Sequence, residues 1–290
     1  MGHKKLIKFA ENETFNCLLQ PSAEEILAKG YFNLQDHEIK GHWNERMFAK
    51  DQPIIVELGC GKGEYTIDLA ERNPEFNYIG VDIKGARLWK GAKYAHEHKL
   101  GNVAFLRTRI ELISAFFAEN EVAEIWLTFS DPQFRSENSR LTSPLFLERY
   151  RGFMKPGGLV HLKTDSMFLH QYTKAVVACN SLGMVACTED LYATAPADLC
   201  VLPENAASPA ALSQDSVAAL YEVQTFYEKM FLEQGYRITY LSFVIDHDGK
   251  YEYPEFDNEY WRSVEGPRLL FGHDSAETRR QKLAASESGE

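Results

Sequence analysis

Acidic residues recur at the ends of predicted β-strands, close to one glycine-rich turn. Glu57 lies in the first of these strands, and Asp82, Asp131 and Asp165 end three later ones. The turn Gly59-Cys60-Gly61-Lys62-Gly63 follows the strand that contains Glu57. The carboxyl ends of parallel strands meet at one edge of a sheet, where open α/β folds bind their ligands. The sequence therefore predicts a binding site with several carboxylates at that edge.

The glycine turn joins a predicted strand at 53–58 to a helix that begins near Glu64. Gly59, Gly61 and Gly63 allow a backbone turn that other residues tolerate poorly. A dinucleotide fingerprint needs glycine where Glu64 stands, and carboxylates beside the turn would repel a pyrophosphate. S-adenosylmethionine carries a sulfonium and an ammonium but no phosphate, so it suits an acidic turn. The alternative is a structural turn that binds nothing, because a glycine motif alone is weak.

Asp82 ends the second predicted strand, 76–82, and stands 19 residues after Gly63. This separation fits a strand–helix–strand unit. An acid at this position of a nucleoside-binding domain accepts hydrogen bonds from the ribose hydroxyls. The alternative is that Asp82 caps the helix that follows it. We favour the ribose contact, since one carboxylate does not easily fill both roles.

Hydrophobic patterning predicts the elements that would position these residues. Strands are expected at 53–58, 76–82, 103–108, 124–131 and 159–165, alternating with helices near 64–72, 85–99, 110–119, 144–153 and 166–181. A strand near 184–192, a helix near 215–234 and a last strand at 236–245 follow. This order predicts an α/β, Rossmann-like class I methyltransferase fold. We expect a seven-stranded, mostly parallel sheet with one antiparallel strand and helices on both faces. His161, in mid-strand, is interpreted as a hydrogen-bonded core residue.

The composition is that of an ordinary globular protein. The chain has 290 residues, 44% of them hydrophobic and 25% charged. It contains no apolar run long enough for a membrane span and no signal-peptide pattern. Its five cysteines form no C-x-x-C pair, which is typical of a reduced protein without structural zinc. We therefore expect a cytoplasmic protein with no membrane association and no metal.

Three regions are expected along the chain. Residues 1–50 would form an N-terminal extension, with a mobile basic arm at Lys4, Lys5 and Lys8 and a cover for the sheet. Residues 51–246 would form the methyltransferase domain. Residues 247–290 would form a polar C-terminal extension that ends in disorder, and the 193–213 segment reads as an exposed loop.

Basic residues concentrate in one part of this acidic chain, whose net charge is −11. Residues 84–109 contain seven Lys and Arg side chains against the single acid Glu97. Such a stripe could dock a polyanion in one orientation, and the alternative is a solvated helix face. Arg135 and Arg140, in the loop after Asp131, are suited to contacts with phosphates or base edges.

Several segments together resemble the bacterial tRNA (guanine-N7)-methyltransferases over about residues 1–245. The matching segments are Glu57-Leu58-Gly59-Cys60-Gly61-Lys62-Gly63-Glu64, Ile79-Gly80-Val81-Asp82, Phe129-Ser130-Asp131-Pro132, Arg140-Leu141-Thr142, His161-Leu162-Lys163-Thr164-Asp165 and Thr225-Phe226-Tyr227-Glu228. The Ser-Asp-Pro and Thr-x-x-Glu segments are far more specific than the glycine turn.

The resemblance implies roles for individual residues. Glu57 and Asp82 would hold the methionine and ribose parts of S-adenosylmethionine, and Asp131 would lie between this cofactor and the guanine as the catalytic acid. Asp165, Thr225 and Glu228 would contact the guanosine. Arg135 stands where the family has a substrate-binding lysine, and Arg109 stands where it commonly has an acid. The predicted cofactor-binding residues are Glu57, Gly59, Gly61, Gly63, Asp82, Ile83, Arg109, Ile110 and Asp131.

These features predict an enzyme that methylates guanine N7 in the variable loop of tRNA. The expected partner is tRNA, and we expect a monomer or a homodimer. One alternative is a class I methyltransferase that acts on a small molecule or a protein, which the acidic net charge favours. The other is a non-catalytic RNA-binding subunit with the same fold, which is supported by the unusual Arg109 and by the altered loop after Asp131.

Overall fold

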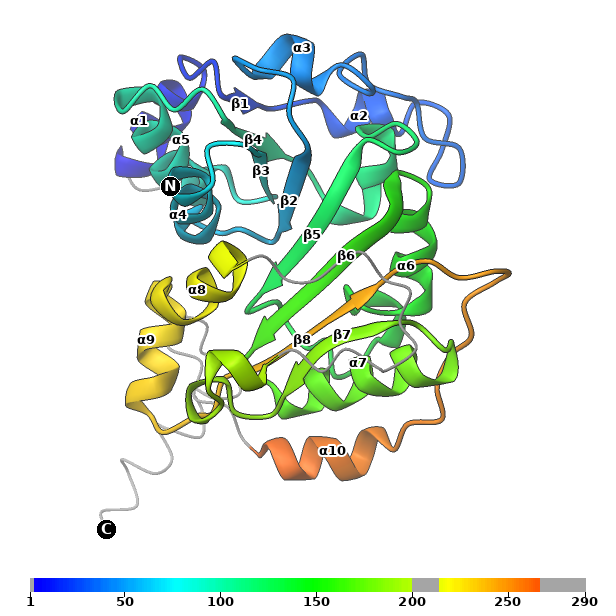
Figure 1. Cartoon of the computed structure of the whole chain (residues 1–290). Helices are drawn as coiled ribbons and strands as arrows, with labels where there is room; N and C mark the ends of the chain where they lie inside the picture. Colours follow the sequence, from blue (N-terminus) through cyan, green and yellow to red (C-terminus); the bar gives the residue numbers. More distant parts are fainter. Residues whose placement is uncertain (1–2, 200–213, 267–290) are drawn as a thin grey trace, which may run out of the picture.

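The protein is described by a computed structural model that covers residues 3–199 and 214–266, without the side chains of 3–5 and 214–216 (Figure 1). The last part of the predicted 193–213 loop and the end of the C-terminal extension lie outside the described residues. At the centre is one eight-stranded sheet in the order β1-β4-β3-β2-β5-β6-β8-β7. The strands are β1 (Leu18–Leu19), β2 (Ile54–Leu58), β3 (Asn77–Asp82), β4 (Val103–Arg107), β5 (Val122–Thr128), β6 (Met154–Thr164), β7 (Met184–Thr188) and β8 (Thr239–Val244).

The sheet confirms the predicted fold class and adds one strand. The pairs from β1 to β6 are all parallel, while β8 runs antiparallel to both β6 and β7. The prediction of seven strands was one short because β1 has only two residues. Leu18 and Leu19 pair with Phe105 and Leu106 at the edge of the sheet. A two-residue strand has no periodicity from which it could be recognised.

Helices cover both faces of the sheet, because strands buried on both sides need two apolar layers above them. One face carries α4 (Glu64–Arg72), α5 (Gly85–Glu97), α8 (Gln214–Glu222) and α9 (Phe226–Glu233). The other carries α3 (Trp43–Met47), η1 (Ile110–Ala115), α6 (Pro144–Arg151) and α7 (Met167–Cys179). The helix predicted near 110–119 is the short 3₁₀ segment η1. The remaining helices are α1 (His3–Asn12), α2 (Ala23–Ile26) and α10 (Asn258–Glu265).

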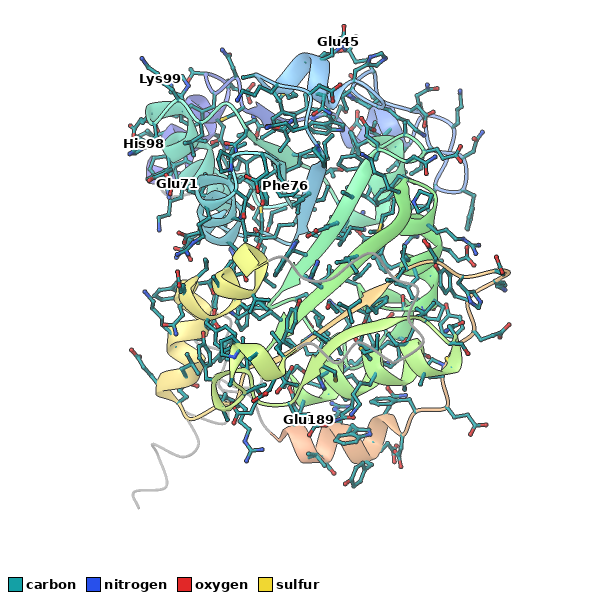
Figure 2. All side chains as sticks on the ribbon, in the orientation of Figure 1. Glu45, Glu71, Phe76, His98, Lys99 and Glu189 are labelled. Carbon is teal, nitrogen blue, oxygen red and sulfur yellow. The ribbon has the colours of Figure 1, made fainter. Side chains whose placement is uncertain are left out.

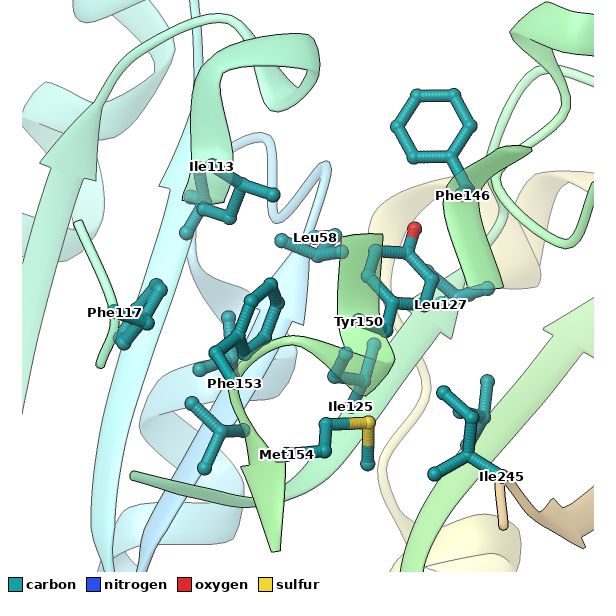
Figure 3. Packing of buried hydrophobic residues seen from close by; sticks show 14 of the residues in the cluster. Leu58, Ile113, Phe117, Ile125, Leu127, Phe146, Tyr150, Phe153, Met154 and Ile245 are labelled. Carbon is teal, nitrogen blue, oxygen red and sulfur yellow. The ribbon is translucent and has the colours of Figure 1, made fainter. Parts of the chain in front are cut away.

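The core between α6 and the sheet shows how the sequence builds the second face. Ser143 precedes α6 and Pro144 opens it, a favourable first position for a proline. Tyr150 and Phe153 then pack over Ile125 and Leu127 of β5, as Figure 3 shows. All four side chains are buried. Burial of each such side chain stabilises the fold by about 1.5–3 kcal/mol.

The N-terminal segment, which was predicted as a mobile basic arm, forms the helix α1. The first helix, α1, packs against α5, where the Asn12 amide donates to the carbonyl of Gly85 at 2.9 Å. The Lys8 ammonium lies 4.4 Å from the centre of the Trp89 ring. Other side chains of α4 and α5 are not packed in this way. Glu71 near the end of α4, and His98 and Lys99 just after α5, are exposed to solvent (Figure 2). Lys4, Lys5 and Lys8 therefore all belong to helix α1, and Lys8 contacts α5.

Within the described residues, no helix is long and apolar enough to cross a membrane.

Candidate active site

The glycine turn is held against the neighbouring strand by backbone hydrogen bonds. The amides of Gly59 and Cys60 both donate to the carbonyl oxygen of Val81, at 2.8 and 3.0 Å. Gly63 has a φ of +72°, and a Cβ at this position would lie 2.6 Å from Phe105. Gly59, with a φ of +84°, has no atom within 4 Å of where its Cβ would lie. The turn is thus tightly packed against Phe105 at Gly63 and has free space beside Gly59.

Asp82 connects the turn to the start of α5. Its Oδ2 accepts from the Gly61 amide at 3.0 Å, and its Oδ1 accepts from the Lys84 amide at 2.7 Å. The contact with Lys84 is a local turn before α5 and not the helix cap that the sequence left as an alternative, because Lys84 is itself the N-cap residue and α5 has no side-chain cap hydrogen bond. Each carboxylate oxygen can accept a further hydrogen bond, and Asp82 lines a cavity. One carboxylate can therefore hold the backbone and still bind a ligand.

Glu57 does not reach the cavity but ties three elements together behind it. Its side chain is buried, and the hydroxyls of Thr66 on α4 and Thr128 on β5 donate to its two oxygens. Burial raises the pKa of Glu57, and the two threonine hydrogen bonds oppose that rise. In this geometry Glu57 supports the turn from below.

The loop after β5 carries Asp131 in a constrained backbone. Phe129 and Gln133 adopt φ values of +51° and +49°, a region that non-glycine residues rarely occupy. The Gln133 amide donates to Asp131 Oδ1 at 2.9 Å, which closes a tight turn. Asp131 is exposed and lines the cavity. Strain of this kind, about 1–3 kcal/mol for each such residue, persists at functional sites where surrounding structure enforces it.

A cavity of about 910 Å³ lies at the carboxyl ends of the strands. Its size is that of a small-molecule site. The structure brings seven of the predicted site residues to its wall, namely Gly59, Asp82, Ile83, Arg109, Ile110, Asp131 and Asp165. Glu57, Gly61, Gly63, Arg135, Thr225 and Glu228 do not line it. Among the described residues, no group of three or more His, Cys, Asp or Glu side chains is placed to hold a metal.

Arg109 stands where an acid was expected from the family resemblance, and an acid, Glu111, follows two residues later. Glu111, on η1, lines the cavity beside Arg109, whose Nε lies 3.9 Å from the Glu111 carboxylate. Sequence reasoning missed Glu111 because it looked for the acid at the strand end. In the structure, the acid lies instead in the first turn of the 3₁₀ helix η1, which places the Glu111 side chain at the cavity wall.

The predicted substrate residues Thr225 and Glu228 have structural roles in α9. Thr225 caps the helix, since its hydroxyl accepts from the Glu228 amide at 3.2 Å. The Glu228 carboxylate is fully buried and lies 2.7 Å from the Lys163 ammonium of β6. Tyr192 donates to the same carboxylate oxygen at 2.7 Å. Two other residues of this helix reach the cavity wall: Phe231, and Tyr227, which stands inside the Thr-x-x-Glu segment but was given no role there.

The two arginines of the Asp131 loop differ sharply in exposure. Arg135 is exposed, as a residue that contacts phosphate would be. Arg140 is only 1% exposed, with its guanidinium 4.7 and 4.3 Å from the ring centres of Phe168 and Tyr172. Burial lowers the pKa of Arg140. The expectation that Arg140 contacts phosphate was therefore wrong for this structure.

His161 is a core residue, as predicted. It has no exposed surface, stacks on Trp126 with ring centres 4.0 Å apart, and lies 2.8 Å from the Tyr240 hydroxyl. Its other ring nitrogen lies 3.2 Å from the Glu124 carboxylate. It takes no part in the cavity.

The basic stripe divides into two parts. Lys84 and Arg87 line the cavity. Lys90 pairs with Glu64 at 2.9 Å, and Lys93 lies 3.7 Å from Glu11. The second part is therefore the neutralised helix face of the alternative interpretation, while the first part borders the site.

A mostly parallel sheet with one antiparallel strand, and with a glycine turn and strand-end acids around one cavity, defines a Rossmann-like class I methyltransferase fold. A family model described as a putative methyltransferase matches residues 51–200. The chain is 46% identical over 248 residues to the tRNA (guanine-N(7)-)-methyltransferase of Christiangramia forsetii, covering 84% of this chain and 100% of that one. It is 41% identical over 259 residues to the protein of the same name from Bacteroides thetaiotaomicron, covering 89% and 92%.

The chain therefore belongs to the tRNA (guanine-N(7)-)-methyltransferase family. Among solved structures, the 16S rRNA methyltransferase KamB aligns with a TM-score of 0.49 and 13% identity, over 73% of this chain and 95% of that one.

The environment of Glu57 predicts a specific pH dependence of stability. A carboxyl group with a raised folded-state pKa contributes most below its unfolded pKa, near 4.3, and this contribution is lost as the pH rises through the folded value. Glu57→Gln cannot ionise. Its free energy of unfolding, relative to the natural protein, should therefore increase between pH 4 and pH 8, as urea denaturation at several pH values would measure.

Glu75→Gln, at an exposed position, is the matched control and should show no such trend. A difference between Glu57→Gln and the natural protein that stays constant with pH would contradict the assignment of Glu57 as a buried, ionisable support.

Proposed function

We propose that this methyltransferase transfers the methyl group of S-adenosylmethionine to guanine N7 in the variable loop of tRNA. The proposal is supported above all by one arrangement in a chain of this family: the glycine turn, Asp82 and Asp131 line a single cavity. In this proposal the methyltransferase domain spans residues 51–246, with extensions at 1–50 and 247–290. A cytoplasmic location and a monomer or homodimer remain predictions.

The cavity residues fit the proposed cofactor. The space above Gly59 and Gly61 is free of atoms to 4 Å, so a ligand can approach the backbone there. Asp82 has lone pairs left for the ribose hydroxyls, and Ile83, which is 52% exposed, offers an apolar surface for a base. Ile110 and the Arg109–Glu111 pair would complete the adenine side, with Glu111 in place of the family's acid. Glu57 and Gly63 would act by holding the turn.

When bound, S-adenosylmethionine would supply a methyl group attached to a positively charged sulfur. Guanine N7 has an in-plane lone pair and carries no proton, so this chain does not need a general base. Its residues need to align the acceptor with the methyl group, and such alignment can account for much of the rate. Positive charge develops on the purine during transfer, and the exposed Asp131 carboxylate in the cavity wall would stabilise it.

The acceptor side of the cavity would use residues from separate segments. Asp165 follows β6 directly and lies at the cavity wall, where it would accept hydrogen bonds from the guanine. Arg135 would contact a phosphate from the outer side of its loop. Thr225 and Glu228 would serve the substrate indirectly, because they fix α9 and so the wall residues Tyr227 and Phe231.

The direct test of the proposed function uses S-adenosylmethionine with a labelled methyl group and bulk tRNA. We expect 7-methylguanosine in the nuclease digest, located in the variable loop. A labelled small molecule or protein in place of tRNA would support the alternative methyltransferase. Binding of tRNA without transfer of label would support the non-catalytic RNA-binding subunit.

Two substitutions separate the charge of Asp131 from its role in the loop. Asp131→Ala removes both the charge and the acceptor of the Gln133 amide, and it should lower kcat by more than tenfold without unfolding the protein. Asp131→Asn keeps an oxygen for that amide but removes the charge. If the charge acts on the purine, both variants should be similarly slow in single-turnover methylation. Near-normal turnover of Asp131→Asn would show that the charge of Asp131 is not needed and that its role is to bind the Gln133 amide. Near-normal turnover of Asp131→Ala would show that Asp131 has no role in the reaction.

The basic residues at the cavity predict a salt-dependent contact with tRNA. If Lys84 and Arg87 neutralise phosphates, the double variant Lys84→Gln/Arg87→Gln should bind tRNA more weakly. Its plot of log affinity against log salt should be flatter by about one per lost contact. Filter binding between roughly 50 and 200 mM salt would measure the slope. The control is Lys155→Gln, an exposed lysine near the opposite end of β6. Equal slopes for all three proteins would place the tRNA elsewhere.

A further inference from the structure

The C-terminal segment 251–265 lies against α7 and against the loop between β5 and α6, and this loop forms one side of the cavity. Its helix, α10, packs along α7 at the lower side of the molecule in Figure 1. The loop between β5 and α6, residues 129–143, supplies Phe129, Ser130, Asp131, Pro132, Gln133, Phe134, Ser139 and Leu141 to the cavity wall. The segment itself does not line the cavity. Any effect that it has on the site must therefore pass through α7 and this loop.

Arg140 makes the most deeply buried of the contacts between the loop and the segment. Its guanidinium lies between the rings of Phe168 and Tyr172 on α7, and its Nη2 donates to Asn258 Oδ1 of α10 at 2.6 Å. The Glu137 carboxylate is 3.9 Å away, too far for a good hydrogen bond. Asn258 is thus the close acceptor on α10 for a nearly fully buried cation, which also forms a side-chain hydrogen bond with Tyr172 of α7.

Aromatic rings continue this contact from the cavity wall to α10. Phe134, in the wall, packs edge-on against Phe168, with ring centres 4.8 Å apart. Phe168 in turn contacts Phe256 at 5.4 Å, and Phe256 stacks on Trp261 at 6.4 Å. The guanidinium of Arg262 on α10 lies 5.9 Å from the Phe134 ring. The wall residue Phe134 is therefore supported both through Phe168 and by α10.

Polar contacts fix the segment at its two ends. Near its start, the Tyr253 hydroxyl donates to Asn138 Oδ1 in the loop at 2.6 Å. At its end, the Glu265 carboxylate accepts from the Phe168 amide at 2.9 Å. That amide belongs to the first turn of α7, where a helix favours negative charge. The segment thus contacts both the loop and the start of α7.

The loop needs this support because its own backbone is strained. Phe129 and Gln133, on either side of Asp131, have left-handed φ values, and such conformations persist only where the surroundings enforce them. We infer that segment 251–265 is a buttress for the 129–143 loop, and that Arg140 is a positioning residue which acts on the reaction through Phe134 and Asp131 without touching the substrate. The catalytic part of this inference rests on the proposed function.

The test compares three variants of the full chain at neighbouring positions. Asn258→Ala removes the acceptor of Arg140 while favouring the helix. Asn258→Asp supplies an acceptor with a charge opposite to that of Arg140. Glu259→Ala, at the next and exposed position of α10, is the matched control. Two measurements are made: hydrogen exchange of peptides covering 129–143 without ligand, and steady-state methylation of tRNA.

In Asn258→Ala we expect exchange of the loop to be roughly tenfold faster, the change that loss of one hydrogen bond to a charged group produces. We also expect kcat to fall by about the same factor, with the Kd for S-adenosylmethionine in calorimetry changed by less than about twofold. Asn258→Asp should restore both the exchange rate and kcat. Glu259→Ala should match the natural protein.

The inference is overturned if Asn258→Ala exchanges its loop at the rate of Glu259→Ala, or if the loop exchanges faster while kcat stays unchanged. If Asn258→Ala unfolds altogether, as faster exchange of β2 would reveal, Tyr253→Phe decides. It removes only the hydroxyl that binds Asn138, and it should still accelerate exchange of the loop. If the natural protein does not methylate tRNA, the proposed function fails, whereas the exchange rates still confirm or refute the buttress.

Discussion

The arrangement around the cavity depends on one buried ion pair. Lys163, in the interior strand β6, has no exposed surface, and a buried ammonium is tolerated only when its donors are used. Its three donors have three acceptors: Glu228 of α9 at 2.7 Å and the carbonyl oxygens of Leu220 and Val223 at 2.7 and 3.2 Å. Leu220 lies in the last turn of α8, where a positive charge is favoured. One side chain thus fixes the end of α8 and the start of α9 over the sheet.

Because α9 is held in this way, its outer residues fall on the cavity wall. Tyr227 and Phe231 line the cavity, whereas Glu228, on the inner side of the helix, faces Lys163. Burial lowers the pKa of Lys163, and the nearby Glu228 opposes that change. Removal of either partner would leave the other charge buried without compensation, a loss of about 3–5 kcal/mol. A requirement for Glu228 in the enzyme could therefore arise from the position of α9 alone, without contact with the guanosine.

The strand-end acids looked alike in the sequence, yet they occupy three different environments. Glu57 is enclosed by two threonine hydroxyls, Asp82 shares its carboxylate between backbone amides and the cavity, and Asp131 is exposed in a strained loop. Their common edge could be predicted because parallel strands all end there. Their separate roles could not, because these depend on contacts across the chain. Thr128, for example, is 71 residues away from the Glu57 that it binds.

The same distinction explains what the sequence predicts well and what it does not. The side proposed for the methyl donor consists mainly of local strand–turn–helix units, whose glycines and acids stand at fixed spacing, and it was predicted residue by residue at Gly59, Asp82 and Ile83. The acceptor side is assembled from segments far apart. Arg140 reads as a phosphate ligand until Phe168, Tyr172 and Asn258 are seen around it, and Tyr227 has no signal until Lys163 fixes its helix. Specificity for the acceptor would thus depend on two helices beyond the parallel strands, α9 and α10. Each is held by a buried cation that comes from the sheet or from the Asp131 loop.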